Sequence, residues 1–297
     1  MNNIRRTMLF VPGNNASFFK DVITYCPDTV MFDLEDSIHI DQKDAARQLT
    51  QKMINFFEYN KYGIETAVRI NSWDTDFYQE DLEFILNSKV DMIRLPKVET
   101  KKDVFKVISD IEKIEKKINR SKKIILFCAL ESAKGILNAY EIATSSERVV
   151  GIALGGVDYL FDLKATKTKD RHELLFARNM IVHAARAAKI DAFDCIYGNV
   201  NDLEGLEKET RFAKELGFSG KSVIHPTQLR VIKKIFSPTN EEIQNALDIL
   251  NAYQKHLKFG KGVFSFNGQM IDKPFLEHSR KLLIEANIQI YNLEKIF

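Results

Sequence analysis

Short apolar stretches alternate with amphipathic ones along almost the whole chain, and this alternation restricts the fold more than any other feature of the sequence. Each apolar stretch ends at a polar residue, a glycine or a proline, as a buried strand does. The segments between them carry apolar residues at helical spacing. Strands that alternate with helices build a parallel sheet, because a parallel connection needs a crossover. The sequence predicts eight strands, at residues 7–11, 29–34, 66–70, 92–95, 124–130, 149–154, 192–196 and 222–224.

Eight strand and helix units follow one another without a break in composition or a low-complexity linker. This favours an α/β fold of the closed (β/α)8 TIM-barrel type over an open doubly wound sheet. We expect the barrel in residues 1–238. Residues 239–297 would form a C-terminal extension of helices and an active-site flap, packed as part of the same domain. Gly260, Gly262 and Gly268 favour a mobile flap, although an irregular loop explains them equally well.

Several helix positions can be assigned from spacing and capping residues. One apolar stripe lies in a segment that is otherwise rich in Lys and Glu, which predicts a solvated helix face; it consists of Val104, Val107, Ile108, Ile111, Ile114 and Ile118. Asp41 precedes another such stripe and is predicted to be its N-cap. Ser132 is predicted to cap the helix that begins near Ala133.

Composition excludes several classes of protein. Lys and Arg number 43 against 41 Asp and Glu, a balance that does not indicate a nucleic-acid or membrane surface. The cysteines Cys26, Cys128 and Cys195 are far apart and odd in number, which argues against a disulfide framework or a zinc site. No apolar run reaches the roughly 18 residues of a membrane span, and no signal peptide is visible. We therefore expect a cytoplasmic protein.

In a barrel of this type, functional groups project from the C-terminal ends of the strands. Polar residues at the predicted ends are the candidates for substrate binding, metal binding and catalysis. They are Glu35 and Asp36, Arg69 and Asn71, Glu131, and Asp158.

Glu131 and Asp158 follow two adjacent strands, which lie about 4.8 Å apart in a sheet. Two carboxylates, with the other octahedral positions left to water and substrate, are a common way to hold Mg²⁺. The sequence offers no His or Cys cluster for zinc or iron. A Glu before a helix can also serve only as a partner of the helix dipole. The predicted barrel position favours the metal site, and Gly155 and Gly156 would permit close approach to a ligand.

Arg69 lies in a strand that should be buried, so its charge needs an anionic partner. That partner could be Glu35 or Asp36, or the carboxylate of a substrate held in a bidentate pair. The histidines show no paired spacing, and neither a GxGxxG after a strand nor a Walker motif is present. Chemistry that depends on a nucleotide cofactor is therefore disfavoured.

A series of motifs in order along the chain resembles the HpcH/HpaI aldolase family that contains the citrate lyase beta subunit and acyl-CoA lyases. The similarity runs from Arg5 to about Leu283 through RRTMLFVPGNN, VMFDLEDSI, VRIN, DMIRLPKVE, ALESAKGILNA, GGVDYLFDL and GVFSFNGQMIDKP. The resemblance implies a (β/α)8 barrel that forms a homotrimer and holds Mg²⁺ through Glu131 and Asp158. It further implies that Arg69 binds the carboxylate of an oxo-acid. It also implies that Asp272 is the catalytic acid or base, carried on the flap of a neighbouring subunit.

The activity implied by this resemblance is the cleavage of a citryl-thioester into oxaloacetate and an acetyl-thioester. The thioester would be carried by an acyl carrier protein, with the citrate lyase alpha and gamma subunits as partners. The GGVDY motif stands between the forms found in the two branches of the family, so coenzyme A remains an alternative carrier. A stand-alone malyl-CoA or citramalyl-CoA lyase is the second hypothesis. A barrel that only binds a dicarboxylate or serves as a scaffold is the third.

Overall fold

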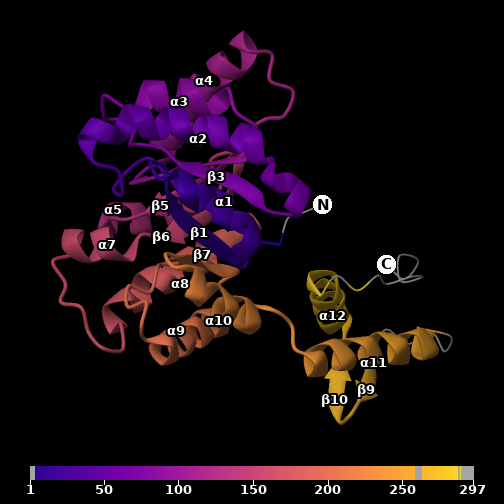
Figure 1. The fold of residues 1–297 in the computed structure, drawn as a ribbon. Coiled ribbons are helices and arrows are strands. Elements are labelled where there is room, and N and C mark those ends of the chain that lie inside the picture. The colour runs from indigo at the N-terminus through magenta and orange to yellow at the C-terminus, as the bar shows by residue number, and fades with distance from the viewer. Residues whose placement is uncertain (1–3, 258–262, 287, 289–297) are drawn as a thin grey trace. The chain divides into compact units, whose positions relative to one another are not determined.

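The computed structural model describes residues 4–257, 263–286 and 288. It divides the chain into two compact units, Met1–Lys234 and Ile235–Phe297 (Figure 1). The division lies close to the predicted boundary between residues 238 and 239. That the second unit packs as part of the same domain stays a prediction.

The first unit is a closed barrel of eight parallel strands in sequence order, with β8 hydrogen-bonded back to β1. The predicted fold class is therefore confirmed, and each predicted strand agrees with the structure within two residues at either end. The strands are β1 (Thr7–Pro12), β2 (Thr29–Asp33), β3 (Glu65–Arg69), β4 (Met92–Leu95), β5 (Ile125–Leu130), β6 (Val149–Leu154), β7 (Asp191–Asp194) and β8 (Gly220–Val223).

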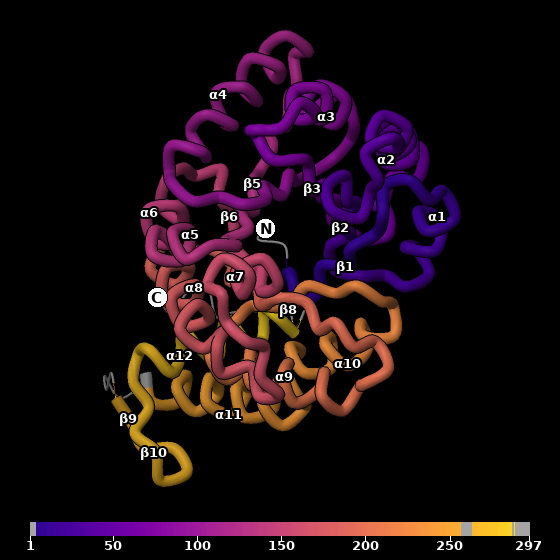
Figure 2. The backbone as a smooth tube through the Cα atoms, turned by 90° about the vertical axis from the view of Figure 1, so that its left-hand side faces the viewer, coloured from indigo at the N-terminus to yellow at the C-terminus, as the bar shows by residue number. Residues whose placement is uncertain are grey.

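Helices connect these strands and lie outside the ring that the strands form (Figure 2). The α-helices are α1 (Ala16–Tyr25), α2 (Lys43–Phe57), α3 (Tyr78–Leu86), α4 (Lys101–Lys117), α5 (Ala133–Leu137), α6 (Ala139–Ala143), α7 (Gly156–Asp162), α8 (Leu175–Ala188), α9 (Leu203–Leu216) and α10 (Pro226–Phe236). Short 3-10 helices are η1 (Ile40–Gln42), η2 (Tyr59–Tyr62) and η3 (His172–Leu174). The predicted apolar stripe on α4 buries Val104, Val107 and Ile111.

Two observations test the predicted helix caps. The Ser132 side chain accepts a hydrogen bond from the backbone N–H of Gly135 at 3.1 Å, so this N-cap is confirmed. The prediction for Asp41 is wrong, because Asp41 lies inside η1 and the N-cap of α2 is Gln42. The extra turn of η1, capped by His39, shifts the start of α2 by one residue beyond the predicted position.

The barrel interior is filled in layers, because alternate residues of each strand point inward. One buried layer consists of Met8, Met31, Ala67, Met92, Phe127, Ala153 and Phe193. Two residues further along four of these strands come Phe10, Asp33, Arg69 and Arg94, which therefore face the same interior nearer the C-terminal ends. The apolar layer fills the middle of the barrel. The layer nearer the C-terminal ends of the strands, which is mostly charged, forms the floor of the site.

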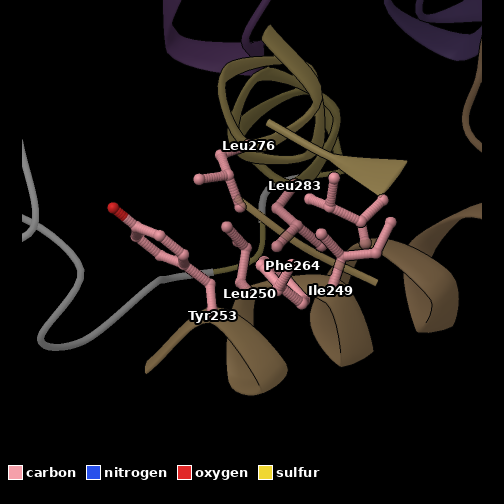
Figure 3. Close-up of a cluster of buried hydrophobic side chains, with 8 residues drawn as sticks. Ile249, Leu250, Tyr253, Phe264, Leu276 and Leu283 are labelled. Carbon is pink, nitrogen blue, oxygen red and sulfur yellow. The ribbon is translucent and has the colours of Figure 1, made fainter. Parts of the chain in front are cut away.

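The second unit contains α11 (Asn240–Leu257), α12 (Lys273–Glu285) and a hairpin of β9 (Phe264–Phe266) and β10 (Gln269–Ile271). Its small core joins side chains of α11, α12 and β9 (Figure 3), among them Ile249, Leu250, Tyr253, Phe264, Leu276 and Leu283. The hairpin occupies part of the segment for which the glycine pattern predicted either a mobile flap or an irregular loop. Its turn is Asn267-Gly268, and both residues have positive φ, as a two-residue hairpin turn requires.

No helix in the described part of the chain is both long enough and apolar enough to cross a membrane.

Candidate functional site

A cavity of 600 Å³ opens at the C-terminal ends of the barrel strands. We call it the mouth cavity, and its charged lining residues are Asp33, Asp36, Arg69, Arg94, Glu131 and Asp158. The strands β2, β3 and β4 supply the first four directly or from the loop that follows. The structure thus brings four of the predicted site residues, Asp36, Arg69, Glu131 and Asp158, to one cavity.

Glu131 follows β5 and is only 5% exposed, whereas Asp158 lies half-buried in the first turn of α7. Burial raises the pKa of Glu131, and the negative charge of Asp158 raises it further, against the opposing effect of Arg94 and Arg69. One oxygen of Glu131, Oε2, is buried and has no hydrogen-bond partner among the described residues. A buried carboxylate oxygen without a donor is unfavourable unless a ligand compensates it.

Gly155 allows the close approach of the strand ends that carry these two acids. Its backbone N–H donates to the carbonyl of Leu130 at 2.9 Å, which ties the turn after β6 to the end of β5. A Cβ at this position would lie 2.3 Å from Cγ of Glu131, far inside contact distance. Glycine is therefore required if Glu131 is to keep its place.

Arg69 is held mainly by Asp33, a residue that was not among the predicted site residues. Its Nε and Nη2 donate to the two oxygens of Asp33 at 2.7 and 2.8 Å, a bidentate pair. Its Nη1 lies 2.8 Å from Glu35 and 3.0 Å from Asp36. Burial alone would lower the pKa of Arg69, but these three carboxylates outweigh it and raise the pKa. Glu35 and Asp36, the two acids predicted as partners of Arg69, therefore both contact it. The side chain of Arg69 is 12% exposed and also lines the cavity.

Glu35 and Asp36 differ in their surroundings. Asp36 has a side chain 55% exposed at the cavity, whereas Glu35 is buried and forms ion pairs with Arg69 and, at 3.0 Å, with Lys97. Burial raises the pKa of Glu35 to about 7, and the nearby charges of Asp36 and Glu131 act in the same direction, while Arg69 and Lys97 oppose them. Glu35 therefore titrates near neutral pH.

Asn71 lies behind the mouth cavity, where its side chain is 4% exposed and fully engaged. Its Oδ1 accepts from Lys43 at 2.7 Å, and its Nδ2 donates to Asp81 and to the carbonyl of Leu34. Lys43 also donates to the carbonyls of Leu34 and Glu35. Asn71 therefore supports the loop that carries Glu35, and its predicted contact with substrate stays a prediction.

Asp272 belongs to the second unit, where it is the N-cap of α12. Its side chain accepts a hydrogen bond from the backbone N–H of Phe275 at 3.4 Å, and a proline occupies the first turn. Helix capping accounts for an Asp before Lys-Pro at this position. A catalytic role for Asp272 stays a prediction.

Two lining residues, Asp33 and Arg94, were missed by the sequence reasoning. The signal that identifies them is the period of two along each strand, since Asp33 is two residues beyond the inward-facing Met31 and Arg94 two beyond Met92. That signal requires the inward face of each strand to be assigned first. A buried run such as 92–95 does not show which face that is, because both faces are covered.

The residues at the cavity fit a magnesium ion. Mg²⁺ is commonly bound through one or two carboxylates, with water and substrate in its remaining positions. Glu131 supplies a buried oxygen that lacks a donor, and Asp158 supplies a second carboxylate close enough to perturb the first. Both border a cavity large enough for a substrate and its water molecules.

The family model described as HpcH/HpaI aldolase/citrate lyase matches residues 6–226. The chain belongs to this family. The resemblance seen in the motifs is thereby confirmed.

Two relatives and one solved structure show how close the similarity is. Citrate lyase subunit beta of Leuconostoc mesenteroides subsp. cremoris is 43% identical over 290 residues, which cover 97% of this chain and 95% of that protein. Mitochondrial citramalyl-CoA lyase of Homo sapiens is 33% identical over 294 residues, 95% of this chain and 85% of that protein. Protein CitE of Mycobacterium tuberculosis, solved with magnesium, acetoacetate and coenzyme A, superposes with a TM-score of 0.76. Its identity is 28%, with coverage of 97% and 100%.

Proposed function

We propose that this protein is a magnesium-dependent lyase that cleaves a citryl-thioester into oxaloacetate and an acetyl-thioester, as the beta subunit of citrate lyase. The observation that carries the proposal is the buried oxygen of Glu131 without a donor, at a cavity that Asp158 and Arg69 also line. The 43% identity to a citrate lyase beta subunit supports citryl as the acyl group.

Glu131 and Asp158 would hold the magnesium ion. A bound magnesium ion supplies Lewis-acid stabilisation of negative charge on the oxygen that becomes the ketone of oxaloacetate. Arg69 would bind a carboxylate of the substrate and orient it, because the bidentate pair with Asp33 fixes the plane of the guanidinium. Glu35 and Asp36 complete this group and would set the position of Arg69 relative to the substrate.

Cleavage transfers the proton of the substrate hydroxyl to water, breaks the bond between two carbons and leaves the electron pair of that bond on the acetyl fragment. Asp272 is proposed to deliver a proton to that carbon, as a general acid carried on the C-terminal unit of a neighbouring subunit. This step requires a homotrimer, which is part of the proposal. The cytoplasm, an acyl carrier protein and the citrate lyase alpha and gamma subunits are its proposed setting and partners.

The second candidate function is that of a malyl-CoA or citramalyl-CoA lyase with the same metal and the same Arg69. The 33% identity to a citramalyl-CoA lyase favours it as the alternative. A scaffold without catalysis is the least supported function. The buried Glu131 oxygen without a donor is energetically costly, and a purely structural role would not explain it.

A side-by-side assay tests the proposal. The purified protein is given citryl-carrier protein, citryl-CoA, malyl-CoA and citramalyl-CoA, each with Mg²⁺ and with EDTA, and the oxo-acid product is measured. We expect fastest turnover of the citryl-carrier protein and loss of turnover in EDTA. A strong preference for malyl-CoA or citramalyl-CoA contradicts the proposal, as does turnover that EDTA leaves intact.

A further inference from the structure

Arg94 is a second buried guanidinium at the floor of the mouth cavity. It lies on β4 beside Arg69 of β3, since the two residues are register partners across the strands. Both guanidinium groups lie over the ring of Phe10, at 5.3 Å for Arg69 and 5.2 Å for Arg94. The floor of the cavity therefore presents two cations near one aromatic ring.

The two arginines differ in their partners. Arg69 is matched by three carboxylates, as described above. Arg94 is 4% exposed, and its Nε has no hydrogen-bond partner in the part of the chain that the structure describes. Among the described residues, the hydrogen bond of its Nη1 is to the sulfur of Met8, a weak acceptor, at 3.6 Å. Arg94 thus lines the cavity and has a buried donor that no described residue satisfies.

A buried cation without a partner is costly, and burial lowers the pKa of Arg94 to about 10. The side chain therefore remains charged at neutral pH. Glu131, Glu35 and Asp33 favour the charge from a distance, but none forms an ion pair with it among the described residues. An anion that entered the cavity could form the ion pair that Arg94 lacks. The planar guanidinium suits a carboxylate, which it can bind through two parallel hydrogen bonds.

The proposed substrate has a group that suits this position. A citryl-thioester carries two free carboxylates, one on the carbon that bears the hydroxyl and one on a methylene. The malyl and citramalyl thioesters carry only the first. Arg69 and the proposed metal residues account for the carboxylate beside the hydroxyl. Among the described residues that line the cavity, Arg94 is the other cation, and it is available for the second carboxylate.

We propose that Arg94 binds the methylene carboxylate of the citryl group and so selects citryl over malyl and citramalyl thioesters. This inference rests on the proposed function, because it assumes cleavage of an acyl group that carries two carboxylates. After cleavage the same carboxylate belongs to oxaloacetate, whereas pyruvate, the corresponding product from citramalyl, has a methyl group in its place. The pair of products therefore probes Arg94 without turnover.

The test compares oxaloacetate with pyruvate by calorimetric titration of the full chain in Mg²⁺, for the wild type and for Arg94→Met and Arg94→Lys. We expect Arg94→Met to weaken oxaloacetate binding by about 100-fold and pyruvate binding by less than about threefold. Arg94→Lys, which keeps the charge and loses the fork, should fall between. Arg211→Met, on the exposed face of α9, is the matched control and should change neither.

Thermal unfolding separates binding from a structural role. Arg94→Met removes a buried charge without a partner, so its Tm should equal or exceed that of the wild type. A lower Tm together with an equal loss of affinity for oxaloacetate and pyruvate contradicts the proposal. Unchanged oxaloacetate binding contradicts it as well. Equal weakening of both ligands at an unchanged Tm also overturns it, because Arg94 would then contact a group that the two products share.

The wild type alone tests the proposed function, and the ratio between variants tests Arg94. If the wild type turns over citryl-thioester while Arg94→Met keeps the full preference for citryl over citramalyl, only the inference about Arg94 fails. If the wild type does not turn over citryl-thioester, the proposed function itself fails.

Discussion

Two groups of buried charges in the barrel differ in how completely they are paired. The first, which we call the Asp194 cluster, consists of Arg178, Asp194, Glu209 and Lys221. Asp194 accepts from Arg178 at 2.9 and 3.0 Å and from Lys221 at 2.6 Å, and Lys221 also donates to Glu209 at 2.7 Å. At the mouth cavity, by contrast, Glu131 and Arg94 form no ion pair among the described residues, and Glu131 Oε2 and Arg94 Nε have no hydrogen-bond partner there. Arg178 Nη1 in the Asp194 cluster also lacks a hydrogen-bond partner, but each charged group of that cluster has an ion-pair partner.

Acidic residues alone do not distinguish a binding site from a structural cluster. Ligand atoms of Asp194, Cys195 and Glu209 lie within 4.8 Å of one another, which resembles a metal site. Yet Lys221 and Arg178 supply the opposing charge there, and against the effect of burial they hold the pKa of Asp194 well below its usual range. The unpaired groups at the mouth cavity are therefore the better sign of function, since their cost is recovered only when a ligand binds.

The largest effect that this comparison predicts is on activity at Glu131. Glu131→Gln should lower kcat/KM for citryl-thioester by about 1,000-fold, because an amide is a poor ligand for magnesium and carries no charge. The Tm should stay the same or rise, because a buried charge beside Asp158 is removed. Steady-state kinetics and thermal unfolding measure both. Glu207→Gln on the exposed face of α9 is the control, and turnover of Glu131→Gln within tenfold of the wild type would refute the metal assignment.

Asp194→Asn should lower stability, which Glu131→Gln should not. It leaves Lys221 and Arg178 with a smaller opposing charge in the interior, so the free energy of unfolding should fall by about 3–5 kcal/mol. Urea unfolding measures this loss. Adding Lys221→Met to Asp194→Asn should restore part of it, because the uncompensated cation is then gone. A loss below about 1 kcal/mol would show that the cluster is not the structural element that its ion pairs indicate.

The barrel itself could be predicted from the sequence because its signal is repeated in every unit. Most of the eight strands contain a short apolar run that ends at a polar residue, a glycine or a proline, and errors at single positions do not alter the count. The position of Glu131 and Asp158 at one cavity followed from the same rule, since strand ends share one face of the barrel. The hairpin of β9 and β10 was not predicted, because its strands have only three residues each and carry no clear alternation.

The pairing of the charges could not be predicted in the same way. Asp33, Glu35 and Asp36 are close in sequence, and only the structure shows that Asp33 takes the bidentate position on Arg69. Likewise, Asn71 follows a strand end as the other candidates do, yet its amide is turned away from the cavity toward Lys43 and Asp81. Partner choice depends on contacts between units far apart in sequence, and a local pattern contains no information on them.

Glu35 should make the free energy of unfolding depend on pH. Its pKa of about 7 in the folded protein exceeds the ordinary value of 4.5, so the folded state binds a proton that the unfolded state has released between these two values. The contribution of Glu35 to the free energy of unfolding therefore falls as pH rises from about 4.5 to 7, by roughly 3 kcal/mol in total.

Urea unfolding of the metal-free protein in EDTA, compared with Glu35→Gln across pH 4.5–8, measures this contribution. The difference between the two proteins should change in favour of the variant as pH rises, since the amide does not titrate. A difference that is independent of pH would mean that Arg69 and Lys97 already keep Glu35 ionised throughout, and the carboxylates around Arg69 would then be as fully paired as the Asp194 cluster.

The smallest effect should come from Lys43, which lies behind the mouth cavity and combines features of both regions. Its ammonium group donates three hydrogen bonds, but the acceptors are neutral: the carbonyls of Leu34 and Glu35 and the amide oxygen of Asn71. Lys43→Met fills the same space and leaves these acceptors without a donor, so the free energy of unfolding should fall by about 1–3 kcal/mol. Lys102→Met on the exposed surface of α4 should cost less than about 0.5 kcal/mol. Because the lost bonds fix the loop of Glu35, KM should also rise in Lys43→Met; a stability loss with unchanged KM would show that this loop does not position Arg69 for the substrate.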